Sequence, residues 1–473
     1  MKSTPQKLAL NVVLASISKI LNTVIALGGL MLITRYLGVE QFGLYVTALA
    51  IYGLFNALGD WGLYQTATRE ISRPKANEKI IIGNVFGLRI LISGIFLMLA
   101  GCATYFTTSD PQLRSALLII LIGYLFYSSY QILIGLFQKR LLMYQITFVE
   151  LLGKIIQISL VVIVIKLDLG LKFIISSFSF SLFINLILIY LLSRRFIIFK
   201  INFQTKKWRN FLKESWPIGL SIFVTFLYFK ADSILLKIIK GNTDVGIYGA
   251  AYKVLENITF FPGMIIGLTM PIFSYYIFKD KKKFKEIINK NFKLFILLVI
   301  PLIITTLFFA EEIIGIVAGN DFMASAEVLR IIIFSLAFIF FGTLFGSILI
   351  VAKLQLQQLI ALSIVAIFNI SANLIFIPKF SYLATSYISV ITELLVVVFS
   401  LVIIYKNLNF LPKMKKIPQT TLAGLGMLFY FALLKSLPFF FLLITGPLFY
   451  FSSLFLLKVI TKEEILMLVK KKI

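Results

Sequence analysis

Apolar residues in this chain come in blocks of about 17 to 25 positions, each long enough to cross a bilayer as a helix. In lipid, every backbone N–H and C=O group must be bonded within the protein, and a helix achieves this inside each segment. Strands of a membrane barrel alternate apolar and polar positions, and the runs at 155–165 and 391–404 do not follow that alternation. The pattern therefore predicts an all-α integral membrane protein.

The blocks predict about 14 transmembrane helices. The last two blocks are separated only by a short turn at Pro438, so about twelve or thirteen spans are the alternative if that pair is re-entrant. The expected spans are 10–33, 43–65, 80–104, 113–136, 147–166, 170–193, 216–239, 247–277, 294–312, 328–350, 356–377, 381–404, 419–435 and 438–458.

Basic residues are sorted between the loops. Alternate loops collect 32 of the 46 Lys and Arg residues, the opposite loops hold 8, and 6 lie within the expected spans. Because cytoplasmic loops are the basic ones, this sorting predicts a multi-pass membrane protein with both termini in the cytoplasm. Attraction to anionic membrane lipids then accounts for the net charge of +26, so we expect no nucleic-acid partner.

The composition limits the chemistry that the chain can perform. It has no His and a single Cys, Cys102, so we expect no metal site, no internal disulfide and no cofactor. No loop of the type G-x-x-x-x-G-K-[ST] is present, which argues against direct use of ATP. No segment between the spans is long enough to bury a core of its own. Whatever the protein does, it is therefore expected to do within the membrane.

An eight-residue pattern, G-x-x-x-x-G-x-Y, occurs twice at an offset of 203 residues. It follows the first expected span and again the seventh, and both spans enter from the same side, which predicts two parallel repeats. The pattern residues are Gly38, Gly43 and Tyr45 in the first copy and Gly241, Gly246 and Tyr248 in the second.

The first copy also carries a family resemblance. The stretch Thr34–Tyr45, which includes Arg35, resembles the opening signature of the polysaccharide-biosynthesis flippases, the Wzx-type O-antigen flippases of the MOP superfamily. Residues 232–236 and 245–253 look like the region of the seventh and eighth helices in that family. The resemblance implies six-helix bundles at 1–200 and 201–410 around a central cavity, followed by two further helices and a basic cytoplasmic tail at 411–473.

The resemblance also implies a substrate. Such flippases move undecaprenyl-diphosphate-linked oligosaccharide, the O-antigen repeat unit of lipopolysaccharide or a capsule unit, from the inner to the outer leaflet of the plasma membrane. A polysaccharide polymerase, a chain-length regulator and a coupling ion, proton or sodium, are candidate partners that the sequence does not identify.

Basic side chains within the spans are candidates for binding the lipid diphosphate. An ionisable group at mid-bilayer costs about 2.5 to 3.5 kcal/mol, so we expect each to face protein or a water-filled cavity. Arg89 has no acidic residue three or four positions away, and Lys230 has only Asp232, two positions along, so these two are the preferred ligands. The full set is Arg89, Lys154, Lys230, Lys253 and Lys19.

Two of these lysines have an acidic residue on the same helical face. Glu150 lies four positions before Lys154, and Glu256 lies three positions after Lys253. Such spacings favour ion pairs within a helix. A structural ion pair is therefore the alternative to a cavity role for both lysines.

Acidic residues within the spans are candidates for coupling transport to an ion. Asp60 ends a polar stripe with Tyr52 and Asn56 at four-residue steps, and such a stripe lines a cavity or bonds two helices together. The acidic candidates are Asp60, Asp232, Glu256 and Glu393. They keep open a second interpretation, a multidrug or cation antiporter of the MATE type; a lipid II flippase and a membrane-embedded polysaccharide polymerase are weaker alternatives.

Overall fold

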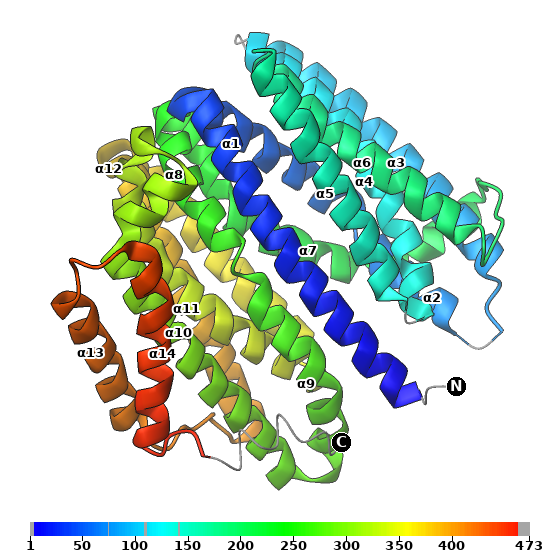
Figure 1. Ribbon diagram of the computed structural model, residues 1–473. Helices are drawn as coiled ribbons and strands as arrows, with labels where there is room; N and C mark the ends of the chain where they lie inside the picture. Colours follow the sequence, from blue (N-terminus) through cyan, green and yellow to red (C-terminus); the bar gives the residue numbers. More distant parts are fainter. Residues whose placement is uncertain (1–3, 74, 108–110, 141, 462–473) are drawn as a thin grey trace. The chain divides into compact units, whose positions relative to one another are not determined.

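The computed structural model describes residues 4–73, 75–107, 111–140 and 142–461, except for the side chains of 4–20, 103–107, 271 and 278. The expected basic tail begins at Lys458, and its residues from Lys462 onward lie outside the described part, as does the side chain of Lys19. The helices (Figure 1) are α1 Thr4–Asp60, α2 Leu63–Ser72, α3 Glu78–Thr107, α4 Pro111–Lys139, α5 Met143–Lys166, α6 Leu171–Ser193, α7 Thr205–Lys240, α8 Asn242–Glu256, α9 Phe260–Lys279, α10 Lys281–Val317, α11 Ala324–Val351, α12 Gln355–Leu408, α13 Ile417–Leu433 and α14 Phe439–Leu456.

The fourteen helices confirm the all-α architecture, although their boundaries differ from the expected spans. Two pairs of spans merge into α1 and α12, each of which is kinked where one residue has a positive φ, 66° at Gly38 and 50° at Ser381. The span expected at 247–277 is instead divided between α8 and α9. Within the described residues, nine helices are long and apolar enough to cross a membrane, and α13 is a shorter apolar helix.

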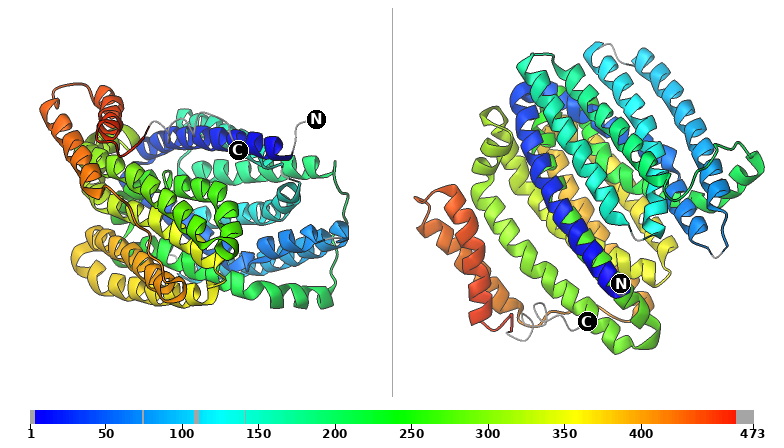
Figure 2. Two further views of the ribbon diagram at one scale, coloured as in Figure 1. Left: turned by 90° about the horizontal axis from the view of Figure 1, so that it is seen from below. Right: turned by 45° about the vertical axis from the view of Figure 1, so that its right-hand side comes forward.

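The chain forms two compact units. The first contains Met1–Ala250, Val317–Asp321 and Leu362–Thr385, and the second contains Ala251–Ile316, Phe322–Ala361 and Ser386–Ile473. In the first unit, α3, α4, α5 and α6 lie side by side (Figure 1), and in the second, α13 packs along α14, as both views of Figure 2 show. The division at 1–200, 201–410 and 411–473 stays a prediction.

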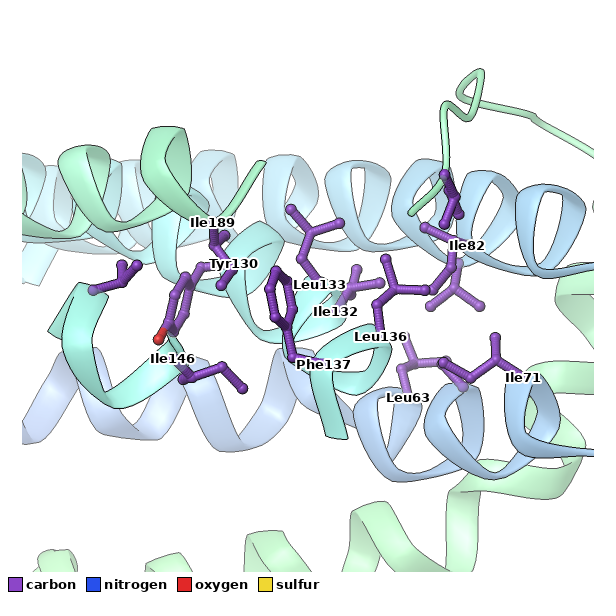
Figure 3. Packing of buried hydrophobic residues seen from close by; sticks show 14 of the residues in the cluster. Leu63, Ile71, Ile82, Tyr130, Ile132, Leu133, Leu136, Phe137, Ile146 and Ile189 are labelled. Carbon is purple, nitrogen blue, oxygen red and sulfur yellow. The ribbon is translucent and has the colours of Figure 1, made fainter. Parts of the chain in front are cut away.

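An apolar cluster holds the helices of the first unit together. Leu133 and Phe137 of α4 lie at its centre, fully buried, and Leu63 of α2, Ile82 of α3 and Ile189 of α6 pack around them (Figure 3). Because lipid is as apolar as these side chains, close packing rather than exclusion of water stabilises such a cluster in a membrane.

The expected cytoplasmic loops of the first unit meet at one end. Glu78, at the start of α3, accepts hydrogen bonds from Lys139 and Arg140, at the end of α4, both at 2.6 Å. Lys139 also donates to the carbonyl oxygen of Ile71, and Arg140 lies over the ring of Phe196 beyond α6. Three of the expected cytoplasmic segments therefore lie together. Which end faces the cytoplasm stays a prediction.

The segment between α6 and α7, together with the first turn of α7, is bound to α3. The backbone N–H of Asn202 donates to Gly83 O at 3.0 Å, and the indole N–H of Trp208 donates to Asn84 O at 2.9 Å. A Cβ atom at Gly87 would come within 2.5 Å of Asn202 O, so the glycine allows the two backbones to touch. These contacts fix the part of α3 that precedes Arg89.

Candidate functional site

Arg89 lies in the interior of the first unit, on α3, and its side chain is fully buried. Its guanidinium group donates to Asp60 Oδ1 at 2.6 Å, to Gly59 O at 2.9 Å and to Gln131 Oε1 of α4 at 2.6 Å. Charge-assisted bonds of this length are among the stronger ones in proteins. Arg89 therefore connects three helices, α1, α3 and α4.

The end of α1 explains why this position holds an arginine. The chain turns sharply after Asp60, because Trp61 and Gly62 both have positive φ values, 44° and 72°. A helix end leaves its last carbonyl groups without partners inside the helix, and here that end is buried. The guanidinium of Arg89 satisfies one of these carbonyls and neutralises Asp60, and a cation is also the favoured charge beside a helix C-terminus.

The backbone of α7 packs directly against this turn. A Cβ atom at Gly219 would lie 2.6 Å from the carbonyl carbon of Trp61, and one at Gly62 would lie 2.6 Å from Ser215 O. Glycine at both positions permits the close approach. The turn that ends α1 is thus held by Arg89 on one side and by α7 on another.

The structure joins two residues that we expected to act separately. Arg89 was expected to be a cavity cation without an acidic partner, and Asp60 an acidic coupling residue. They form a buried ion pair across 29 positions of sequence. Spacing within one helix does not reveal such a pair. The sequence offered one signal for this pair: Asp60 and Arg89 lie at similar depths in two consecutive expected spans. A role for either residue in binding substrate or an ion stays a prediction.

Tyrosines surround this ion pair. The rings of Tyr52 and Tyr127 lie 6.0 Å apart, and the hydroxyl of Tyr124 accepts a hydrogen bond from Ser93 Oγ at 3.3 Å. The hydroxyl of Tyr64 donates to Gln138 at 2.8 Å. Sequence reasoning identified only Tyr52 among these tyrosines, because the others come from α2 and α4 and share no stripe with it.

Lys154 and Lys230 are partly buried in the first unit, on α5 and α7. Lys154 donates to Gln157 Oε1 at 3.2 Å, and Glu150 accepts a hydrogen bond from the hydroxyl of Tyr130 at 3.2 Å. The expected pair between Glu150 and Lys154 stays a prediction. Arg89 is fully buried, whereas both lysines are partly exposed.

The remaining candidates fall into both units. Asp232, only 1% exposed, accepts a hydrogen bond at 3.0 Å from the hydroxyl of Tyr248, a contact between two candidates that sequence reasoning did not connect. In the second unit, Lys253 and Glu256 form the expected ion pair at 2.7 Å, and Glu393 is buried on α12.

The two glycine patterns pack against each other within the first unit. A Cβ atom at Gly43 would overlap Asn242 O, and one at Gly246 would overlap Val39 O. Val39 and Asn242 are the second positions of the two patterns, so each copy supplies the glycine that the other copy's carbonyl contacts. This reciprocity is what a two-fold relation between the repeats requires.

The other pattern residues lie at the same contact between the two copies, which we call the glycine crossing. Gly38 and Gly241 begin the two copies with positive φ values of 66° and 98°, a conformation that favours glycine. Tyr45 and Tyr248 are buried, and Arg35, just before the first copy, is exposed. The ninth positions, Val46 and Gly249, also meet each other: a Cβ atom at Gly249 would lie 2.8 Å from Val46 Cγ2.

The helical architecture recurs in known transporters. A lipid II flippase, MurJ, in an inward closed conformation superposes with a TM-score of 0.79 at 18% identity, covering 95% of this chain and 100% of that one. An inward-facing multidrug resistance transporter of the MATE family has a TM-score of 0.66 at 12% identity, covering 84% and 98%. At these identities the matches show a shared fold, which is that of these transporters.

Sequence comparison identifies the family. The model of the polysaccharide biosynthesis protein family matches residues 8–277, and the chain belongs to that family. The MatE model matches residues 217–375. A Shigella dysenteriae protein provisionally named an O-antigen transporter is 27% identical over 223 residues, which is 46% of this chain and 56% of that protein. The aligned part thus spans little more than half of the relative.

Proposed function

We propose that the protein is a flippase that moves an undecaprenyl-diphosphate-linked oligosaccharide, an O-antigen or capsule repeat unit, from the inner to the outer leaflet of the bacterial plasma membrane by alternating access. Membership of the polysaccharide biosynthesis family and the similarity to the Shigella protein support the substrate class. The observation that carries the proposal is the presence of lysines in the membrane helices of the first unit that are only partly buried.

We assign different roles to the buried cations. A lipid diphosphate carries about two negative charges, which lose hydration when they leave the headgroup layer. Lys154 and Lys230, which are only partly enclosed, replace that hydration by contacting the diphosphate, while the prenyl tail stays in lipid. Arg89 is already neutralised by Asp60, so its role is to hold the end of α1 in position.

The membrane potential supplies a driving force for this direction of transport. An inside-negative potential favours outward movement of an anion by about 2.3 kcal/mol per charge per 100 mV. Two charges therefore gain about 4 to 5 kcal/mol at 100 mV. A proton or sodium ion that binds at acidic residues such as Asp232 or Glu393 is the proposed alternative source of coupling.

Replacing Lys154 and Lys230 with Gln, singly and together, is expected to reduce transport. A hydrogen bond to a charged group is worth about 1.5 to 3 kcal/mol, so each single change should lower the rate about 10- to 100-fold. The measurement is transfer of labelled lipid-linked glycan to the outer leaflet of spheroplasts. The matched control is Lys206→Gln with Lys207→Gln, which removes two exposed charges from the start of α7.

Full transport by the doubly substituted protein, at normal abundance in the membrane, would refute the role of the two lysines. A second function, multidrug or cation antiport, is favoured by the MatE match over residues 217–375. The same membranes can be tested for dye efflux. Efflux without glycan transfer would replace the flippase proposal, whereas elongation of the glycan would indicate a polymerase.

A further inference from the structure

A groove of about 480 Å³ lies between α5 and α6 in the first unit. Its walls are almost entirely apolar, with Phe148 and Leu152 on α5 facing Leu188, Leu191 and Leu192 on α6. Phe148 is 56% exposed and Leu191 is 52% exposed, so the groove is open along its length. A hydrocarbon chain is the ligand that such walls accommodate, because they offer contact area and few hydrogen-bonding groups.

The first turn of α5 supplies the polar part of the groove's lining. Tyr144 and Gln145 line this part, and Gln145 Nε2 donates to the hydroxyl of Tyr144 at 3.1 Å. Aromatic residues with one polar end are typical of the interface between hydrocarbon and headgroups. The start of α5 and the end of α6 therefore mark headgroup depth, and the apolar part of the groove extends into the hydrocarbon.

Two arginines follow the groove at this depth. Arg194 and Arg195 come directly after α6, with Arg195 one helical turn beyond Leu191, and both are exposed. Among the described residues, neither guanidinium has an ion-pair partner, whereas the nearby Lys139 and Arg140 share the carboxylate of Glu78. The end of the groove therefore carries uncompensated positive charge.

We propose that this groove binds one chain of an anionic glycerophospholipid of the adjacent leaflet, with its phosphate group on Arg194 and Arg195. An apolar channel with cations at headgroup depth matches the two parts of such a lipid. A flippase cargo must leave headgroup depth during transport, whereas a resident phospholipid keeps its phosphate there. Arg194 and Arg195 stay at headgroup depth throughout transport. They can therefore hold the phosphate of a resident phospholipid continuously, but not that of a cargo that leaves this depth. This binding does not depend on which substrate the protein transports.

The charge predicts a measurable lipid preference. A basic residue near an anionic surface favours binding by about 5-fold, so two arginines should favour phosphatidylglycerol over phosphatidylcholine by about 30-fold. Native mass spectrometry of the purified full-length protein, titrated with each lipid, measures the retained adducts. Arg194→Gln with Arg195→Gln should abolish the preference. Leu188→Trp, which fills the groove, should reduce binding of both lipids.

Two controls keep the test decisive. Lys206→Gln with Lys207→Gln removes the same charge from exposed positions outside the groove and should leave the preference unchanged. Because all four basic residues are exposed, these variants should fold, and a thermal melt in phosphatidylcholine checks this. The proposal is overturned if both double variants lose the preference equally, or if neither does. It is also overturned if undecaprenyl diphosphate displaces phosphatidylglycerol at equal concentration, because the groove would then hold the cargo.

Discussion

Asp60→Ala should destabilise the first unit by about 3 to 5 kcal/mol, since it leaves the buried guanidinium of Arg89 without its counter-charge. The cost is high because Arg89 is held by α3 and α4 and cannot reach water. The same change weakens the end of α1, which Arg89 binds through Gly59 O. The thermal unfolding midpoint of the purified protein measures the effect.

A double variant separates a structural role from a role in transport. Asp60→Leu combined with Arg89→Met replaces the ion pair with apolar side chains of similar size, which is often neutral or stabilising for buried pairs. We expect it to recover part of the stability lost in Asp60→Ala, because it removes the unpaired charge but leaves Gly59 O and Gln131 Oε1 without their donor. If glycan transfer recovers together with stability, neither charge contacts the substrate or an ion, as expected for a structural pair. Recovered stability without transfer would instead show that one of the two charges contacts substrate or an ion.

Gly43→Ala is the second change for which we expect a large effect. The added methyl group would overlap Asn242 O, a backbone atom that cannot rotate away as a side chain can. The backbones must separate, which destroys packing on both sides of the crossing. Gly246→Ala should have a similar effect because of its contact with Val39 O. Folded protein in the membrane and glycan transfer should both fall at least tenfold, an energy of about 1.4 kcal/mol or more.

Gly28 provides the matched control on the same helix. A Cβ atom at Gly28 would meet nothing within 4 Å, and alanine is favoured over glycine in a helix by about 0.8 to 1 kcal/mol. Gly28→Ala should therefore be neutral or slightly stabilising. Equal behaviour of Gly28→Ala and Gly43→Ala, measured by fluorescence-detected size exclusion, would show that the crossing tolerates separation.

The helical fold was predictable because lipid imposes one requirement on every segment: enough apolar residues with internally bonded backbone. What the sequence did not reveal was which spans join into one helix. The kink at Ser381, with a φ of 50°, lies at the boundary between the expected spans 356–377 and 381–404, but both spans belong to α12. The break between α8 and α9 lies at Asn257–Thr259, where hydropathy averages the polar Asn257 and Thr259 with the apolar residues on either side.

The candidate site was predictable only where its contacts are local. Lys253 and Glu256 lie three positions apart on one helix, and their ion pair was expected and is present. The partner of Arg89 depends on how α1 and α3 pack, which the spacing within one helix does not determine. The residues near Arg89 in the sequence offer no acidic partner, which suggested that a substrate would supply one. In the fold, Asp60 is that partner.

The glycine crossing has a consequence for the origin of the chain. Each pattern contributes both a glycine and the carbonyl group that contacts the opposite glycine, so the contact is isologous. Two separate copies of one half could form it without any residue specific to the other half. If the two patterns arose by duplication, the ancestral half would already have carried a homodimer contact at this point. Joining two such copies would then require only a linker between them.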